Sequence, residues 1–101
     1  MKYKTFDDYK KTERFKVLAP PMQVQVALYF LGEKDKMKEV SENSLKKSLG
    51  GISNEEIYRG ALISQIKNEI ECKVVEGNLL FKLNHEGACM VEPLLFHVPG
   101  T

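Results

Sequence analysis

The sequence predicts an α+β domain, mostly helical, with one two-stranded hairpin and a short third strand. Three observations lead to this fold class. Apolar residues recur at helical spacing through most of the chain, and a strand-like alternation begins only near residue 72. Proline or glycine residues separate the helical stretches. Gly77-Asn78 stands between the two strand-like stretches, as in tight hairpins.

Two prolines separate the first two predicted helices. Thr5 followed by acidic residues has the form of an N-cap and predicts a short helix over residues 6–14. Pro20-Pro21 ends that stretch and suits the first turn of a second helix. Apolar spacing of i, i+3, i+4 and i+7 predicts one buried face for this helix, which ends at Gly32. The residues of that face are Val24, Ala27, Leu28 and Leu31.

A loop and a short strand lead into the third helix. The polar run 33–38 predicts the loop, and residues 39–41 predict a short strand that ends in an N-cap at Ser41. In the helix that follows, Leu45 and Leu49 are spaced to face inward.

A glycine turn joins this helix to a long one. Gly50-Gly51 predicts that this helix ends in a tight turn, because glycine tolerates positive φ. Ser53 with Glu56 three residues later has the pattern of a capping box and opens the long helix. Its inward residues are predicted to be Ile57, Leu62, Ile66 and Ile70.

The last third of the chain predicts a hairpin and a closing helix. Strands are expected over 72–76 and 79–83. Asn84 can cap the final helix, which Pro93 is expected to disturb. Residues 97–101 are expected to form a flexible tail. The inward residues of the final helix are predicted to be Ala88, Val91 and Leu95.

Length and composition indicate one globular domain. The chain has 101 residues, of which 43% are hydrophobic and 29% are charged, so it can bury a core of its own. We expect a basic N-terminal arm or short helix over 1–17 and a folded domain over 18–96. The longest apolar run, 26–31, is far shorter than the ~18 residues of a membrane span. The charged N-terminus lacks the apolar stretch of a secretory signal, so we expect a cytoplasmic protein.

The charge is unevenly distributed although the net charge is only +1. Residues 1–16 carry six Lys or Arg and three acidic residues, with aromatic residues between them that can dock the arm on the domain. Residues 53–77 carry five acidic residues and three basic ones. The segment that contains the long helix therefore has a net negative charge. The N-terminal arm has a net positive charge and is the basic candidate for nucleic-acid contact.

This element order resembles the winged helix-turn-helix superfamily of DNA-binding regulators. The stretches that carry the resemblance are SLKKSLGGISNEEIYRGAL and GNLLFKLNHEG. The resemblance implies that the helix from about 54 to 70 enters the major groove of double-stranded DNA and that the hairpin 72–83 is the wing. By position, the base-facing residues would be Asn54, Glu55, Tyr58 and Arg59. Residues that would meet phosphates are Lys46 and Lys47 on the supporting helix, with Lys73 and Lys82 on the wing.

A second hypothesis is a winged-helix adaptor that binds protein, such as a small viral or plasmid product that docks on a host factor. Glu55 and Glu56 favour it, because carboxylates at the start of a recognition helix repel phosphate. These carboxylates also suit the helix dipole, and exposed lysines on any helix can be a solvated face. In either case we expect a homodimer, paired through the apolar run 94–96 and the aromatic N-terminal helix.

No pattern in the sequence predicts catalysis, a metal site or a cofactor. The Cys and His residues of the chain are Cys72, His85, Cys89 and His97. His85 and Cys89 can share one helical face, so a zinc site or a nucleophile pair is conceivable. However, the paired C-x-x-C of small zinc sites is absent, and nothing provides an orienting third group or an oxyanion site. We therefore expect no metal and no enzymatic activity.

Overall fold

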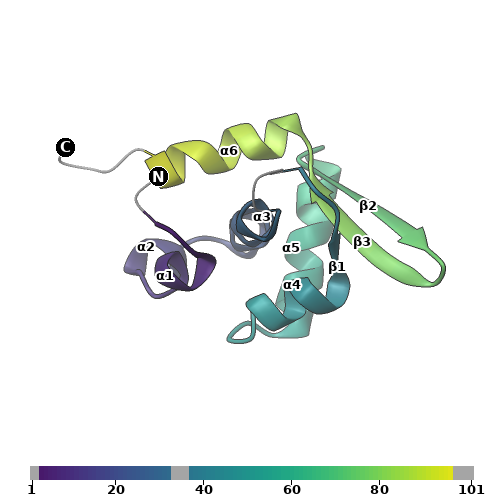
Figure 1. Cartoon of the computed structure of the whole chain (residues 1–101), viewed down its shortest axis with the longest axis horizontal. Coiled ribbons are helices and arrows are strands. Elements are labelled where there is room, and N and C mark those ends of the chain that lie inside the picture. Colours follow the sequence, from purple (N-terminus) through teal and green to yellow (C-terminus); the bar gives the residue numbers. More distant parts are fainter. Residues whose placement is uncertain (1–2, 33–36, 97–101) are drawn as a thin grey trace.

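The computed structural model describes residues 3–32 and 37–96, and over these residues the chain is α+β (Figure 1). Its sheet is antiparallel, with the strand order β1-β3-β2. The predicted fold class is therefore confirmed, and the arrangement is compatible with a winged-helix layout. The elements are α1 (Phe6–Lys10), α2 (Glu13–Lys16), α3 (Pro20–Leu31), β1 (Val40–Ser41), α4 (Glu42–Ser48), α5 (Asn54–Ile66), β2 (Ile70–Val75), β3 (Asn78–Leu83) and α6 (His85–Phe96).

Two short helices replace the single helix predicted over residues 6–14. The N-cap at Thr5 is confirmed, since its Oγ1 accepts from the Asp8 amide at 3.2 Å. The prediction missed that Thr12 caps a second helix: its Oγ1 accepts from the Phe15 amide at 3.3 Å. A threonine in an extended conformation satisfies the amides of a new helix start, so the chain turns there.

Helix α3 lies at the centre of the molecule and contacts α1, α4, α5, α6 and β3 (Figure 1). Its start at Pro20 is as predicted. More of the helix surface is buried than the single face that the sequence predicts. Gln25, Val26 and Tyr29 are buried along with Val24, Ala27 and Leu28. A helix surrounded on most sides by other elements is buried on most of its surface. Leu31 is only half-buried.

The caps of α4 and α5 are as predicted, and a tight turn joins these helices, also as predicted. Ser41 Oγ accepts from the Ser44 amide and Ser53 Oγ accepts from the Glu56 amide, each at 3.2 Å. Among the described residues, Gly77 is the one glycine with positive φ, so Gly50-Gly51 turns without using the left-handed backbone that glycine tolerates. The amide of Ile52 bonds to the Leu49 carbonyl at 2.9 Å and closes this turn.

The hairpin turn is shifted by one residue from its predicted place. Val75 pairs with Asn78, so the two turn residues are Glu76 and Gly77 rather than Gly77 and Asn78. Their φ values of 50° and 79° correspond to a type I′ turn, which matches the twist of the flanking strands. The strand β2 also begins earlier than predicted, because Ile70 pairs with Leu83 and belongs to the sheet, not to α5.

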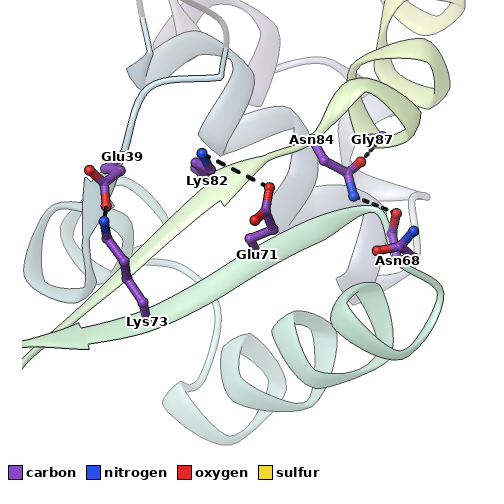
Figure 2. A network of polar contacts seen from close by, with 7 residues as sticks. All are labelled: Glu39, Asn68, Glu71, Lys73, Lys82, Asn84 and Gly87. Atoms are coloured by element: carbon purple, nitrogen blue, oxygen red, sulfur yellow. Dashed lines mark hydrogen bonds and ion pairs between the residues drawn. The ribbon is translucent and has the colours of Figure 1, made fainter.

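The side chain of Asn84 holds the start of α6 against the loop between α5 and β2. Asn84 Oδ1 accepts from the Gly87 amide at 2.9 Å, which confirms the predicted cap. Its Nδ2 donates to the carbonyl of Asn68, a residue with φ of 60° (Figure 2). Contrary to prediction, α6 continues through Pro93 to Phe96. Val91 and Leu95 are buried, as predicted.

The N-terminal helices contribute to the same core as the rest of the chain. Phe6, Tyr9 and Phe15 are buried, and the rings of Phe6 and Tyr9 each form an edge contact with the Phe15 ring. The aromatic N-terminal helix is therefore not the free dimer surface that the sequence predicts. In the C-terminal run, Leu95 is buried and Phe96 is half exposed, at 52%. The predicted tail 97–101 and most of the predicted loop 33–38 lie outside the described residues.

Candidate functional site

The candidate site is the outward side of the helix pair α4–α5 together with the β2–β3 hairpin. Leu45 and Leu49 are fully buried, as predicted, and fix α4 against the core. Figure 1 shows the hairpin extending away from the helical body, beside α5 and α4. The outward surfaces of these elements are what a partner can reach.

Small residues form the inner face of α5 and bring it close to α3. A Cβ on Gly60 would lie 2.7 Å from the Pro20 carbonyl oxygen, so only glycine allows this approach. Ser64 follows Gly60 by four residues on the same face. Its Oγ donates to the Pro21 carbonyl at 3.3 Å and accepts from Gln25 Nε2 at 2.9 Å. Ala61 and Ile57 complete the buried face.

This packing leaves an apolar row on the outer face of α5. Tyr58, Leu62 and Ile66 are 40%, 57% and 75% exposed, and their spacing of four places them along one side of the helix. We call these three residues the α5 row. The sequence predicts Leu62 and Ile66 as core residues, which is wrong. The register shifts because close backbone contact at Gly60 selects small residues for the interior.

The predicted base-facing residues are all exposed at the first half of α5. They are Asn54, Glu55, Tyr58 and Arg59. Arg59 Nη2 lies 3.1 Å from Glu55 Oε1, one turn away, so the arginine is paired with a carboxylate of its own helix. The α5 row and this ion pair together form the outward surface of the helix.

The two lysines of α4 differ in their surroundings. Lys46 Nζ lies 3.5 Å from Glu42 Oε1 and 4.9 Å from the centre of the Tyr58 ring. The interaction with Tyr58, and secondly the charge of Glu42, raise the pKa of Lys46. Only 28% of its side chain is exposed, so the prediction that it points outward holds only in part. Lys47 is exposed, as predicted.

Both lysines of the wing lie beside carboxylates on the sheet (Figure 2). Lys73 Nζ lies 2.7 Å from Glu39 Oε2, so this ion pair connects β2 to the residue just before β1, the strand on the other side of β3. Lys82 Nζ lies 4.0 Å from Glu71 Oε2, its cross-strand neighbour. The sequence predicts neither Glu39 nor Glu71 as a partner of these lysines. The Glu71–Lys82 pair follows from the observed register, whereas the predicted turn at Gly77-Asn78 would place Lys82 opposite Lys73.

The charges of the helix pair and hairpin balance. Residues 37–83 contain seven Lys or Arg and seven Glu, with no Asp. Four of the five basic side chains assigned to DNA contact have a carboxylate within 4.0 Å. A phosphate would have to displace these carboxylates, which would then remain near it. Such a surface offers DNA little of the net positive charge that drives non-specific binding.

The basic N-terminal helices are held close to α4. Lys10 Nζ donates to the Ser48 carbonyl at 2.8 Å, near the C-terminal end of α4. Lys10, Lys11 and Lys16 line a shallow hollow that also includes Asp7. One of these lysines, Lys16, lies 3.6 Å from Glu13. This patch is therefore also of mixed charge.

The cysteine and histidine residues do not form a metal site within the described part of the chain. Cys89 Sγ lies 3.6 Å from His85 Nε2, so these two share a helical face as the spacing predicts. No group of three potential ligands occurs among the described residues, and His97 lies outside them. Cys72 is half-buried in β2, where burial raises the pKa of its thiol.

Comparison of the chain with protein-family models, with curated proteins and with solved structures finds no match. The resemblance to winged-helix proteins therefore depends on the order of the helices and strands. Within the described residues, none of the helices combines the length and apolar character that spanning a membrane requires.

Proposed function

We propose that the chain is a winged-helix binding domain without catalytic activity, and that α5 docks on a protein. The observation that carries this proposal is the α5 row. A helix that reads DNA in the major groove needs hydrogen-bonding side chains along its outer face, because base edges are recognised mainly by donors and acceptors. The first half of α5 carries such groups, but Leu62 and Ile66 make its second half an exposed apolar surface, which a protein partner can bury.

The electrostatics of the surroundings support a protein partner. Interfaces between proteins bury apolar and aromatic side chains at the centre and place charged residues at the rim. The α5 row has this order, with the Glu55–Arg59 and Glu42–Lys46 pairs beside it. Because the charges of these ion pairs already balance, the pairs lose little favourable electrostatic energy when a neutral protein surface approaches.

The proposal can be tested with a photo-crosslinking residue at position 62 in cells that naturally express the protein. Leu62→p-benzoylphenylalanine should give adducts that resist nuclease and are removed by protease. The control is the same residue at Met90, which is on α6 and similarly exposed, at 49%. Nuclease-sensitive adducts, or no excess of adducts over the Met90 control, would contradict the proposal.

DNA binding by the groove insertion of α5 is the second candidate. The observation that favours it is the projecting hairpin, whose Lys73 and Lys82 are 59% and 41% exposed and can exchange their carboxylates for phosphates. Lys47 and Arg59 would then add a phosphate and a base contact. Fluorescence anisotropy of labelled duplexes at low salt would test this candidate. Lys47→Ala should then weaken binding to every duplex, whereas Arg59→Ala should cost ~1–3 kcal/mol on a preferred site alone.

A further inference from the structure

We infer that the free edge of β2 pairs with the same edge of a second copy of the chain, in an antiparallel register centred on Cys72. The inference concerns the edge of the sheet, so it does not depend on what docks on α5. It also gives the expected homodimer an interface other than the chain termini.

The strand β2 lies at the edge of the sheet and leaves backbone groups unpaired (Figure 1). Val75 and Asn78 flank the two-residue turn, so they form a hydrogen-bonded pair. Such pairs alternate along an antiparallel ladder, which leaves the N–H and C=O groups of Cys72 and Val74 pointing away from β3. Within residues 3–32 and 37–96, no backbone group bonds to them on that side. Another strand offers donors and acceptors at the matching spacing, so a strand is the partner that this edge fits.

This edge lacks the features by which natural proteins prevent pairing between sheets. β2 pairs with β3 without a bulge over its whole length and contains no proline. Its last two residues, Val74 and Val75, are 68% and 42% exposed. A lysine on an edge strand usually opposes self-pairing, but Glu71 stands two residues before Lys73. The two charges can therefore complement each other between copies.

The positions of these charges select one register. A two-fold axis at Glu71 or at Lys73 would place that residue opposite its own copy, and like charges directly opposite each other are unfavourable. An axis at Ile70 or Val74 would bring no opposite charges together. An axis at Cys72 places Glu71 opposite the partner's Lys73, and this contact occurs twice. Such a self-complementary edge is what a closed dimer requires.

Both charges already have a neighbour within the chain, and the register adds a second neighbour to each. Lys73 Nζ lies 2.7 Å from Glu39 Oε2, and Glu71 Oε2 lies 4.0 Å from Lys82 Nζ. In the dimer each Lys73 would lie between two carboxylates and each Glu71 between two lysines, so neither intrachain pair has to break. The four side chains are between 41% and 60% exposed. The charges therefore determine the register, while the backbone hydrogen bonds hold the copies together.

The short length of the edge sets the strength of the dimer. About five residues of each copy would meet, fewer than the roughly 20–30 residues per side of a standard interface. We therefore expect a dissociation constant on the order of 100 µM. At that strength the chain is mainly a monomer when dilute and a dimer when it is locally concentrated.

Sedimentation velocity between about 10 µM and 1 mM measures this association directly. Val74→Pro removes the N–H that would donate to the carbonyl of the partner's Ile70, so it should weaken dimerisation at least about tenfold. The hairpin does not use this N–H, so circular dichroism should show that the variant remains folded. The control Val74→Thr keeps the N–H and the β-branched shape, and it should leave the dissociation constant within about twofold.

Two charge variants test the register. Glu71→Lys and Lys73→Glu each place like charges opposite each other in a homodimer, so each alone should associate at least about tenfold more weakly. An equimolar mixture should recover the wild-type dissociation constant, because one copy then carries lysine at both positions and its partner carries glutamate at both. Each variant loses its own intrachain ion pair in the homodimer and in the mixed dimer alike. The recovery therefore reports contacts between copies. Lys47→Glu, an exposed position on α4, is the control and should leave association unchanged.

Isotope-filtered NMR on a mixture of labelled and unlabelled chains locates the contact. The register predicts a close approach between the Hα atoms of Glu71 and of the partner's Lys73, since these residues would form a non-hydrogen-bonded pair. A chain that is monomeric at about 1 mM, equal effects of Val74→Pro and Val74→Thr, or no recovery in the mixture would overturn the inference. Contacts between copies that are confined to α5 or to the termini would overturn it as well.

Discussion

Replacement of Gly60 by alanine tests whether close contact between α5 and α3 determines which side of α5 faces the core. The new Cβ would lie 2.7 Å from the Pro20 carbonyl oxygen and 3.0 Å from the Pro21 nitrogen. Ordinary contact begins near 3.4 Å, so the two backbones must separate by about 0.7 Å. The neighbours are backbone atoms, which cannot rotate away as a flexible side chain can.

Two opposing effects set the size of the change. Overpacking costs about 1–3 kcal/mol, and contact with backbone atoms that cannot move aside places this site in the upper part of that range, at about 2–3 kcal/mol. Alanine inside a helix is favoured over glycine by about 1 kcal/mol, which offsets part of that loss. We expect a net loss of about 1–2 kcal/mol in the free energy of unfolding, and a fall in Tm of roughly 5–15 °C for a domain of this size.

Urea unfolding followed by circular dichroism at 222 nm measures the change, with Gly51→Ala as the matched control. A Cβ on Gly51 meets nothing within 4 Å, and its φ is not positive, so this variant should differ from the wild type by less than about 0.5 kcal/mol. If Gly60→Ala were as stable as the wild type or more stable, the close contact would not be what excludes larger residues.

Three further variants test features of the fold. Asn84→Ala should lower the free energy of unfolding by about 1–2 kcal/mol in the same urea assay, since it removes the α6 cap and the bond to Asn68. Glu76→Gly should raise it by about 0.5–1 kcal/mol, because residue 76 has φ of 50° and glycine adopts this conformation without strain. Burial, and then Glu92, raise the pKa of Tyr29 from 10.0 to about 12, so the folded chain holds this proton more tightly than the unfolded chain. The free energy of unfolding should therefore fall by about 2–3 kcal/mol between pH 10 and 12, and Tyr29→Phe should reduce that fall.

Local rules predict most of the element boundaries. Four helices begin at a residue whose side-chain oxygen accepts from the amide three residues ahead. These residues are Thr5, Ser41, Ser53 and Asn84. This interaction involves only neighbours in sequence, so one short motif is enough to find it. The break at Thr12 follows the same rule and could have been predicted.

Long-range packing explains the errors. Hydrophobicity favours Leu62 and Ile66 over Gly60 for the interior of α5, but a close approach to the backbone of Pro20 requires the smaller residue. The turn residues Glu76 and Gly77 are likewise selected by strand register. Neither effect is visible in a local stretch of sequence.

The candidate site is predicted in its position but not in its electrostatics. Tyr58 and Arg59 are exposed on α5 as the resemblance implies. The carboxylate beside Lys73 comes from Glu39, which is distant in sequence and approaches only because β1 joins the sheet. The sequence shows which residues carry positive charge, whereas only the fold shows which carboxylates lie beside them.

The strand order β1-β3-β2 has a consequence for the order of folding. The β2–β3 hairpin closes through a two-residue turn, a local event that takes microseconds in isolated hairpins. Val40 pairs with Phe81 about forty residues away, so adding β1 requires a much larger loss of chain entropy. We therefore expect the hairpin to form early and the docking of β1 to belong to the rate-limiting step. Destabilising changes at Val40 should then slow folding, and destabilising changes at the hairpin tip should slow it as well, because the hairpin is already formed in the transition state.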